Sequence, residues 1–139
     1  MIRVFRSLIG SVSGKASINL TLDTNEFLPG EKVNGYFSIK GGSFKQQLNR
    51  LECDLVVTGK QKQAEELIGE GITILTSRSI DPHASSRIPF TFQLPNGLTP
   101  SSNVCQYRFR TKLTFSNGDK RVDHDQIKIL TSKTENISS

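Results

Sequence analysis

The sequence predicts an all-β protein folded as an antiparallel β-sandwich, and one alternating segment is the strongest evidence. Between Cys105 and Phe115 the odd positions are apolar except Thr111, whereas the even positions are polar or charged. A period of two is typical of a β-strand with one buried face and excludes a helix. The alternation recurs in about seven segments, and no second long helical segment is available to cover a sheet. We therefore expect a second sheet to cover the first.

The first three expected strands lie before residue 58. Their inward positions are Ile18, Leu20 and Leu22; Val33, Gly35, Phe37 and Ile39; and Leu51, Cys53, Leu55 and Val57. Residues 25–31 predict a turn, because Pro29 fixes φ at one corner and Gly30 suits the next. The pair Gly41-Gly42 predicts the end of the second strand.

The later strands follow a charged connection at residues 60–66. An apolar and β-branched run covers 67–75, with two glycines inside it, and the next strand covers 88–94. Pro89 indicates an edge strand or a strand start, since proline cannot donate to a ladder. The hairpin signal Ser116-Asn117-Gly118-Asp119 then predicts that the 105–115 strand turns into a final strand at 122–129.

The amino-terminal residues predict a short amphipathic segment. Ile2, Phe5, Leu8 and Ile9 recur at helical spacing. The expected organisation is this segment at 1–15, a sandwich at 16–131 and a polar tail at 132–139. Few positive charges flank the segment, which favours capping of the sandwich over a place on a membrane surface. Because the amino terminus lacks the pattern of a signal peptide, we expect a cytoplasmic location.

Composition limits the classes of function. A chain of 139 residues and 15.4 kDa fits one domain. Cys53 and Cys105 occupy inward positions, which favours buried small hydrophobes over a disulfide, and they form no zinc pattern. The net charge of +5 is moderate, Trp is absent, and no dense basic run alternates with aromatic residues, so we expect no specific nucleic-acid platform.

No group of residues predicts catalysis. Asp123, His124 and Asp125 are the tightest cluster, but neighbours in a strand point to opposite faces, and a polar turn leading into the last strand is the favoured interpretation. His83 lies in an expected loop, and no G-x-S-x-G string accompanies the serines. We therefore predict no enzyme activity, no metal site and no cofactor.

Two sets of residues are candidates for interaction. Arg108, Arg110 and Lys112 line one face of a strand and could bind acidic peptides or lipid headgroups, although an ordinary solvated sheet face is the favoured alternative. The second set is the apolar side of the amino-terminal segment, Ile2, Phe5, Leu8 and Ile9.

Two strings resemble a known family. Residues 28–42 read L-P-G-E-K-V-N-G-Y-F-S-I-K-G-G, and residues 87–95 read R-I-P-F-T-F-Q-L-P. Both are similar to segments of the bacterial sporulation-control protein family, stage-zero protein M, and the resemblance covers about residues 16–131. It implies an arrestin-like (immunoglobulin-like) sandwich in a cytoplasmic regulatory scaffold that is not an enzyme.

The resemblance leaves two functions open. The first is binding of a protein partner through a sheet edge or the basic face, and the alternative is binding of an anionic lipid or nucleic-acid surface. Members of the family usually carry a second sandwich, and a strand left uncovered can pair with another copy. We therefore expect a homodimer joined through an edge strand or through the apolar side of residues 2–12, with a monomer as the alternative.

Overall fold

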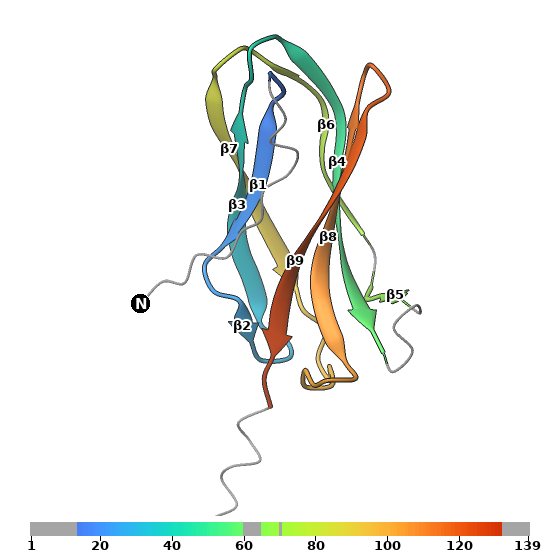
Figure 1. The fold of residues 1–139 in the computed structure, drawn as a ribbon. Coiled ribbons are helices and arrows are strands. Elements are labelled where there is room, and N and C mark those ends of the chain that lie inside the picture. Colours follow the sequence, from blue (N-terminus) through green and yellow to red (C-terminus); the bar gives the residue numbers. More distant parts are fainter. Residues whose placement is uncertain (1–13, 60–64, 70, 132–139) are drawn as a thin grey trace, which may run out of the picture.

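The computed structural model describes residues 14–59, 65–69 and 71–131, and these form two β-sheets packed face to face (Figure 1). Within the described residues there are nine strands, of which β2 and β5 have only two and three residues. No helix of the described part is long and apolar enough to span a membrane. The β-sandwich and its seven longer strands confirm the predicted fold class.

The smaller sheet has three antiparallel strands in the order β1-β3-β7. They are β1 (Ser17–Leu22), β3 (Lys32–Lys40) and β7 (Ser85–Gln93). The register runs without a shift from Ser17 opposite Lys40 to Leu22 opposite Gly35. Pro89 lies in β7, which pairs only with β3, so the predicted edge position of this proline is confirmed.

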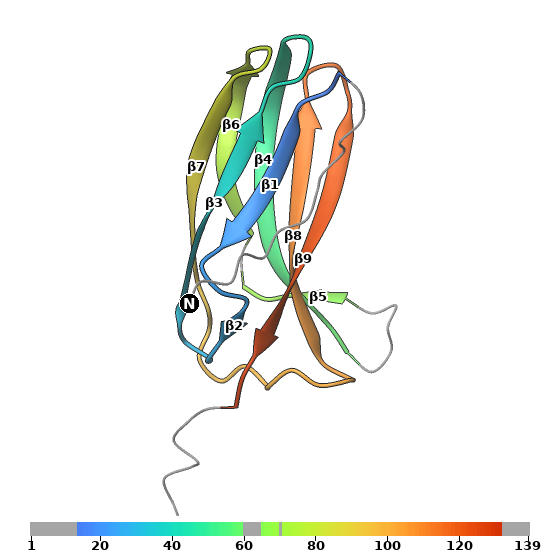
Figure 2. The same cartoon turned by 60° about the vertical axis from the view of Figure 1, so that its left-hand side comes forward.

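The larger sheet has six strands around the long central strand β4 (Gln46–Thr58). The others are β2 (Glu26–Phe27), β5 (Glu65–Leu67), β6 (Ile72–Ile80), β8 (Gln106–Phe115) and β9 (Lys120–Ile129). Strand β8 lies along one edge of β4, while β5 and β6 share its other edge. Figure 2 shows the two sheets from the side of the smaller one.

The core lies between the sheets and consists of their alternating inward side chains. Phe37, Phe90 and Phe92 of the smaller sheet and Phe109 of the larger one are buried together. The ring of Phe109 meets the rings of Phe90 and Phe92 edge to face, with centroids 5.3 Å apart in both pairs. These aromatic contacts join the two sheets across the middle of the sandwich.

Two predicted turns form as the sequence indicates. Gly30 has a φ of 85°, and Glu31 N–H donates to the carbonyl of Leu28 at 3.2 Å, which closes the turn at Pro29. The β8–β9 hairpin turns at Asn117 and Gly118. Asp119, which follows this turn, forms an ion pair with Lys15, with Nζ 3.2 Å from Oδ2. Hydrogen bonds from Lys15 and Asn117 lower the pKa of the Asp119 carboxyl.

Three expectations differ from the structure or lie outside it. The apolar run 67–75 is not one strand, because it spans the end of β5 at Leu67 and the start of β6 at Ile72. Residues 123–125 lie inside β9 and not in a turn before it, so that prediction is wrong. The amphipathic segment, with Ile2, Phe5, Leu8 and Ile9, lies outside the described residues, as does the polar tail.

Candidate functional site: the outer sheet face and the free edge

The outer face of the larger sheet carries the predicted basic stripe. Arg108, Arg110 and Lys112 of β8 point away from the core, because the odd residues of this strand are buried. Their cross-strand neighbours on β4 are Val56, Asp54 and Glu52. The three side chains therefore share the outer face, as the alternation in the sequence predicts.

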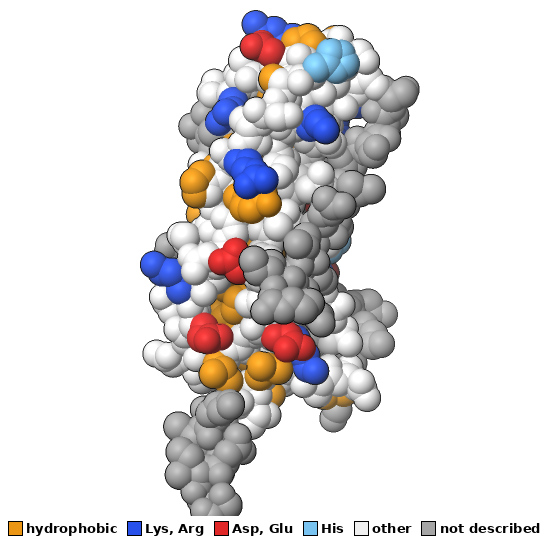
Figure 3. All heavy atoms as spheres, turned by 90° about the vertical axis from the view of Figure 1, so that its left-hand side faces the viewer, with side chains coloured by type: hydrophobic (Ala, Val, Ile, Leu, Met, Phe, Trp, Pro, Cys, Tyr) orange, Lys and Arg blue, Asp and Glu red, His pale blue; other side chains and the backbone are white. Residues whose placement is uncertain are grey.

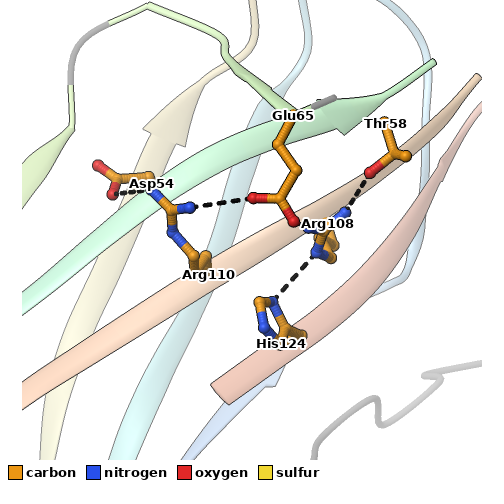
Figure 4. Close-up of polar contacts among 6 residues, drawn as sticks. All are labelled: Asp54, Thr58, Glu65, Arg108, Arg110 and His124. Carbon is orange, nitrogen blue, oxygen red and sulfur yellow. Dashed lines mark hydrogen bonds and ion pairs between the residues drawn. The ribbon is translucent and has the colours of Figure 1, made fainter. Parts of the chain in front are cut away.

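Arg108 is held by three partners from three strands (Figure 4). Its guanidinium donates to the Thr58 hydroxyl at 2.6 Å and to His124 Nδ1 at 3.1 Å, and it forms an ion pair with Glu65. The side chain of Arg108 is only 19% exposed. A guanidinium fixed in this way is part of the packing of the sheet face.

Arg110 shares Glu65 with Arg108 and has a second carboxylate of its own. Its two terminal nitrogens lie 3.2 Å from Glu65 Oε1 and 3.4 Å from Asp54 Oδ2. Asp54 is buried, and a Cβ at position 71 would collide with its carboxylate. Gly71 therefore leaves the space that this carboxylate occupies beside Arg110.

The stripe is thus largely neutralised within the described residues. Arg108 and Arg110 are paired with Glu65 and Asp54, and in the described part of the chain no ion pair forms at Lys112. Binding of an acidic peptide or lipid to these three residues stays a prediction. Such binding would have to compete with carboxylates that already contact the arginines.

The edges of the sheets differ in how they are protected against pairing. Among the described strands, β7 has Pro89 at its edge, β6 has a register shift and Ser77 at φ 63°, and β9 turns charged residues inward. Proline, bulges and inward charges are the common devices that block edge pairing. Strand β1 has none of them: its sequence is SINLTL, and its register with β3 is unbroken.

The free polar groups of β1 can be assigned from the ladder. Asp23 N–H donates to the Asn34 carbonyl at 3.0 Å, and in an antiparallel pair hydrogen-bonded positions alternate. The residues of β1 that bond to β3 are therefore Ser17, Asn19 and Thr21. The N–H and C=O groups of Ile18, Leu20 and Leu22 face the opposite side, where no strand of the described residues pairs with β1.

The candidate catalytic groups do not converge. His124 lies on the outer face with Arg108, whereas Asp125 is buried on the inner face of the same strand, as expected for neighbours in a strand. His83 lies in the turn between β6 and β7. Within residues 14–59, 65–69 and 71–131, no three His, Cys, Asp or Glu side chains are grouped to hold a metal ion.

Neither cysteine forms a disulfide. Cys53 is buried, as predicted, and burial raises the pKa of its thiol to about 12, although it accepts a hydrogen bond from Thr111 at 3.7 Å. It therefore stays protonated near neutral pH and is a poor nucleophile. Cys105 is half-buried and stands just before β8, so the prediction of full burial holds for only one of the two.

Sequence reasoning missed the acidic partners of the stripe and the free edge. Glu65 stands in a segment that was expected to be a charged connection, and it reaches the arginines only because β5 pairs with the end of β4. Asp54 occupied an outward position of a predicted strand, which was the available signal. The free edge of β1 could not be identified before the order of the strands was known.

Comparison with known proteins gives one consistent relationship. A family described as "SpoOM protein" matches residues 5–137. The sporulation-control protein spo0M of Bacillus subtilis (strain 168) is 26% identical over 129 residues, covering 88% of this chain and 50% of that protein. The chain therefore spans about half the length of this relative.

Two solved structures share the fold. The crystal structure of Spo0M from Bacillus subtilis matches with a TM-score of 0.73 at 24% identity, over 86% of this chain and 51% of that one. The alkylpurine DNA glycosylase AlkC of Pseudomonas fluorescens, solved bound to DNA with an abasic site analog, matches with a TM-score of 0.51 at 14% identity. This match covers 85% of this chain and 31% of that one, and at such low identity the similarity shows a shared fold alone.

Proposed function

The chain belongs to the SpoOM protein family, and from this premise we propose that it is a non-enzymatic regulatory binding module. Its partner is a protein, and the contact is made by an extended segment that pairs with β1. The regulatory role follows from the name of the Bacillus subtilis relative, of which this chain covers about half. Cytoplasmic location is part of the same proposal.

The observation that carries the proposal is the unprotected edge of β1. Strand addition uses backbone hydrogen bonds for affinity and alternate side-chain positions for specificity. Ile18, Leu20 and Leu22 offer backbone groups on the open side, and their side chains are fully buried, so the edge is held rigidly by the core. The partner strand would then meet a preformed template and would lose little of its binding energy to ordering of β1.

Hydrogen exchange of single amides tests the proposal. The N–H groups of Ile18, Leu20 and Leu22 should exchange fast in the free protein and become protected when the isolated partner binds. The controls are Arg87 and Thr91 on the open edge of β7, and their amides should not change. Protection at β7, or no change at β1 in a complex of defined stoichiometry, would contradict the proposal.

A matched pair of variants tests the same contact in the cell. Thr21→Lys places a charge on the edge strand, where lysine commonly blocks pairing, and Thr91→Lys places the same charge on β7 of the same sheet. Capture of the partner from a lysate of the source organism should fall at least several-fold with Thr21→Lys. It should be retained with Thr91→Lys, and an equal loss with both variants would count against the β1 edge.

A second copy of the chain could occupy the same edge. This is the predicted homodimer, and light scattering on the intact chain and on a chain lacking residues 1–14 tests it. A dimer in both forms that is lost with Thr21→Lys would identify β1 as the contact. A monomeric mass for both forms at high concentration would remove the homodimer and leave the proposal of a separate partner protein.

A further inference from the structure

The outer face of the smaller sheet differs in charge from every other surface described above. Strands β1, β3 and β7 contain Lys32, Lys40 and Arg87 but not a single Asp or Glu. Within the described residues, neither Lys40 nor Arg87 forms an ion pair, in contrast to Arg108 and Arg110. In Figure 3, which faces this side, blue side chains surround the upper part of the face, and red ones lie below it and at the tip.

A polar hollow on this face is lined by both Lys40 and Arg87. Its volume is about 460 Å³, and it is lined by side chains from all three strands. The strand register forms two rows across it: Ser17, Lys40 and Ser85 in one, and Asn19, Ser38 and Arg87 in the next. Side chains that are opposite in a sheet lie about 5 Å apart, so all six can contact one small ligand.

The donors of the hollow match an oxyanion. A lysine ammonium, an arginine guanidinium and several serine hydroxyls all donate hydrogen bonds, and no lining side chain is a carboxylate. The Arg87 guanidinium rests over the Tyr36 ring, with its Cζ 4.2 Å from the ring centre, and Tyr36 lies one row beyond Arg87 as seen from Lys40. This contact limits the freedom of the side chain, and the exposed guanidinium still turns towards an anion at low cost. Lys40 and Arg87 are both exposed beside the hollow, so an anion can reach them without a change in the fold.

One lining group lacks a partner. Asn19 Oδ1 is buried and has no hydrogen-bond partner among the described residues, although buried polar atoms are nearly always satisfied. Asn19 lies in the same row as Ser38 and Arg87. Because this oxygen is closed to solvent, rotation of the Asn19 side chain is the step that would present its amide to a ligand in the hollow.

We propose that this hollow binds a small, polar phosphate monoester. Lys40 and Arg87 hold the phosphate, and the Ser and Asn side chains bind a hydroxyl-rich body attached to it. The volume lies within the range of about 300 to 1,000 Å³ that is typical of ligand sites, and it leaves room beyond a phosphate group. A membrane surface fits less well, because the large apolar side chains exposed in the described residues, Phe44, Leu67, Val104 and Val122, all lie outside these three strands. The proposal is independent of strand addition at β1.

Titrations followed by NMR test the proposal with three probes at constant ionic strength. Glucose 6-phosphate should shift the amide signals of Ser38, Lys40 and residues 85–87, and inorganic phosphate should bind at the same amides at least fivefold more weakly. Glucose should cause no shift. If inorganic phosphate binds as tightly as the sugar phosphate, the body is not recognised, and the monoester assignment is wrong. If glucose binds as well, the cations are not used.

Three variants with equal loss of charge locate the site. Lys40→Gln and Arg87→Gln should each weaken binding of glucose 6-phosphate about tenfold, which is the usual scale for a charge-assisted hydrogen bond. Lys112→Gln, on the outer face of the other sheet, is the control and should change it less than twofold. All three residues lie on the surface, and the spectra themselves report whether a variant is folded. Equal weakening by all three would show unspecific attraction and overturn the proposal.

A last arm separates the source of the phosphate. Vesicles containing phosphatidic acid present a phosphate monoester on a membrane, and they should not compete with glucose 6-phosphate. Competition that is lost with Arg87→Gln would assign the hollow to a lipid headgroup and overturn the proposal of a small soluble ligand. The absence of any shift with glucose 6-phosphate at tens of millimolar would overturn it completely.

Discussion

Replacing Glu65 by Gln should destabilise the sandwich measurably, although the residue lies in a strand of only three residues. The substitution keeps the size of the side chain and removes the charge that Arg108 and Arg110 share. Glu65 is 39% exposed, so solvent screens both pairs. Exposed ion pairs contribute about 0.2 to 1 kcal/mol each, and the low exposure of the two arginines favours the upper end. The expected loss is therefore about 1 to 2 kcal/mol in the free energy of unfolding.

Urea denaturation at low and high salt is the suitable assay. In thermal unfolding, an entropy of about 2 cal/mol/K per residue converts the same loss of stability into a fall in Tm of about 3 to 7 °C for a chain of this length. The difference between Glu65→Gln and the wild type should shrink as salt increases, because screening weakens pairs that solvent can reach. Glu66→Gln is the control, since Glu66 forms no ion pair among the described residues. Equal effects of the two variants, or a difference that salt does not change, would refute the reasoning.

The further predictions concern the core and the ends of the sandwich. Phe109→Leu should lower the free energy of unfolding, measured by urea denaturation, by about 2 to 4 kcal/mol, because it removes two ring contacts between the sheets as well as buried volume. A loss smaller than that typical of an Ile→Val substitution in a core would contradict this. Gly35→Ala should cost about 1 to 3 kcal/mol in the same assay, since a Cβ there meets the backbone of β1. Iodoacetamide should modify Cys105 and spare Cys53 in the native protein. The raised pKa of Cys53, about 12, means that the unfolded chain loses its thiol proton first; the stability that Cys53 contributes relative to Cys53→Ala should be complete below pH 9 and decline as the pH rises towards 12. Lys15→Gln should raise the pKa of Asp119, measured by NMR titration, because it removes the main hydrogen bond that lowers it.

The sequence predicted the strands well wherever one face of a strand is buried. The alternation in β8 and β3 gave both the strand and its inward residues, because burial of one face forces a period of two. It failed at residues 67–75, where the apolar residues on both sides of Gly69 and Gly71 resemble a single run although β5 ends at Leu67 and β6 begins at Ile72. Periodicity cannot show such a break, since it reports burial and not the path of the chain.

The interaction sites were only partly predictable, because they depend on which strands become neighbours. The outward direction of Arg108 and Arg110 followed from alternation, but Glu65 reaches them from another strand. Lys40 and Arg87 are 47 residues apart in the sequence and come to neighbouring rows of one sheet face only through the pairing of β3 with β7. Charge compensation is therefore a property of the sheet order, which the alternation of residues does not reveal.

The short parallel pair between β2 and β9 has a consequence for the order of folding. Glu26 pairs with Lys128 and Phe27 with Ile129, so β2 gains its partner strand only after about 100 further residues have been made. A nascent chain cannot close this end of the larger sheet until β9 has left the ribosome, and until then one edge of β8 lacks its neighbour. Such distant pairings make folding slow and expose unpaired edges. Chaperone capture of the growing chain would then be strongest just before residue 120 emerges and would end once the hairpin at Asn117 and Gly118 brings β9 into place.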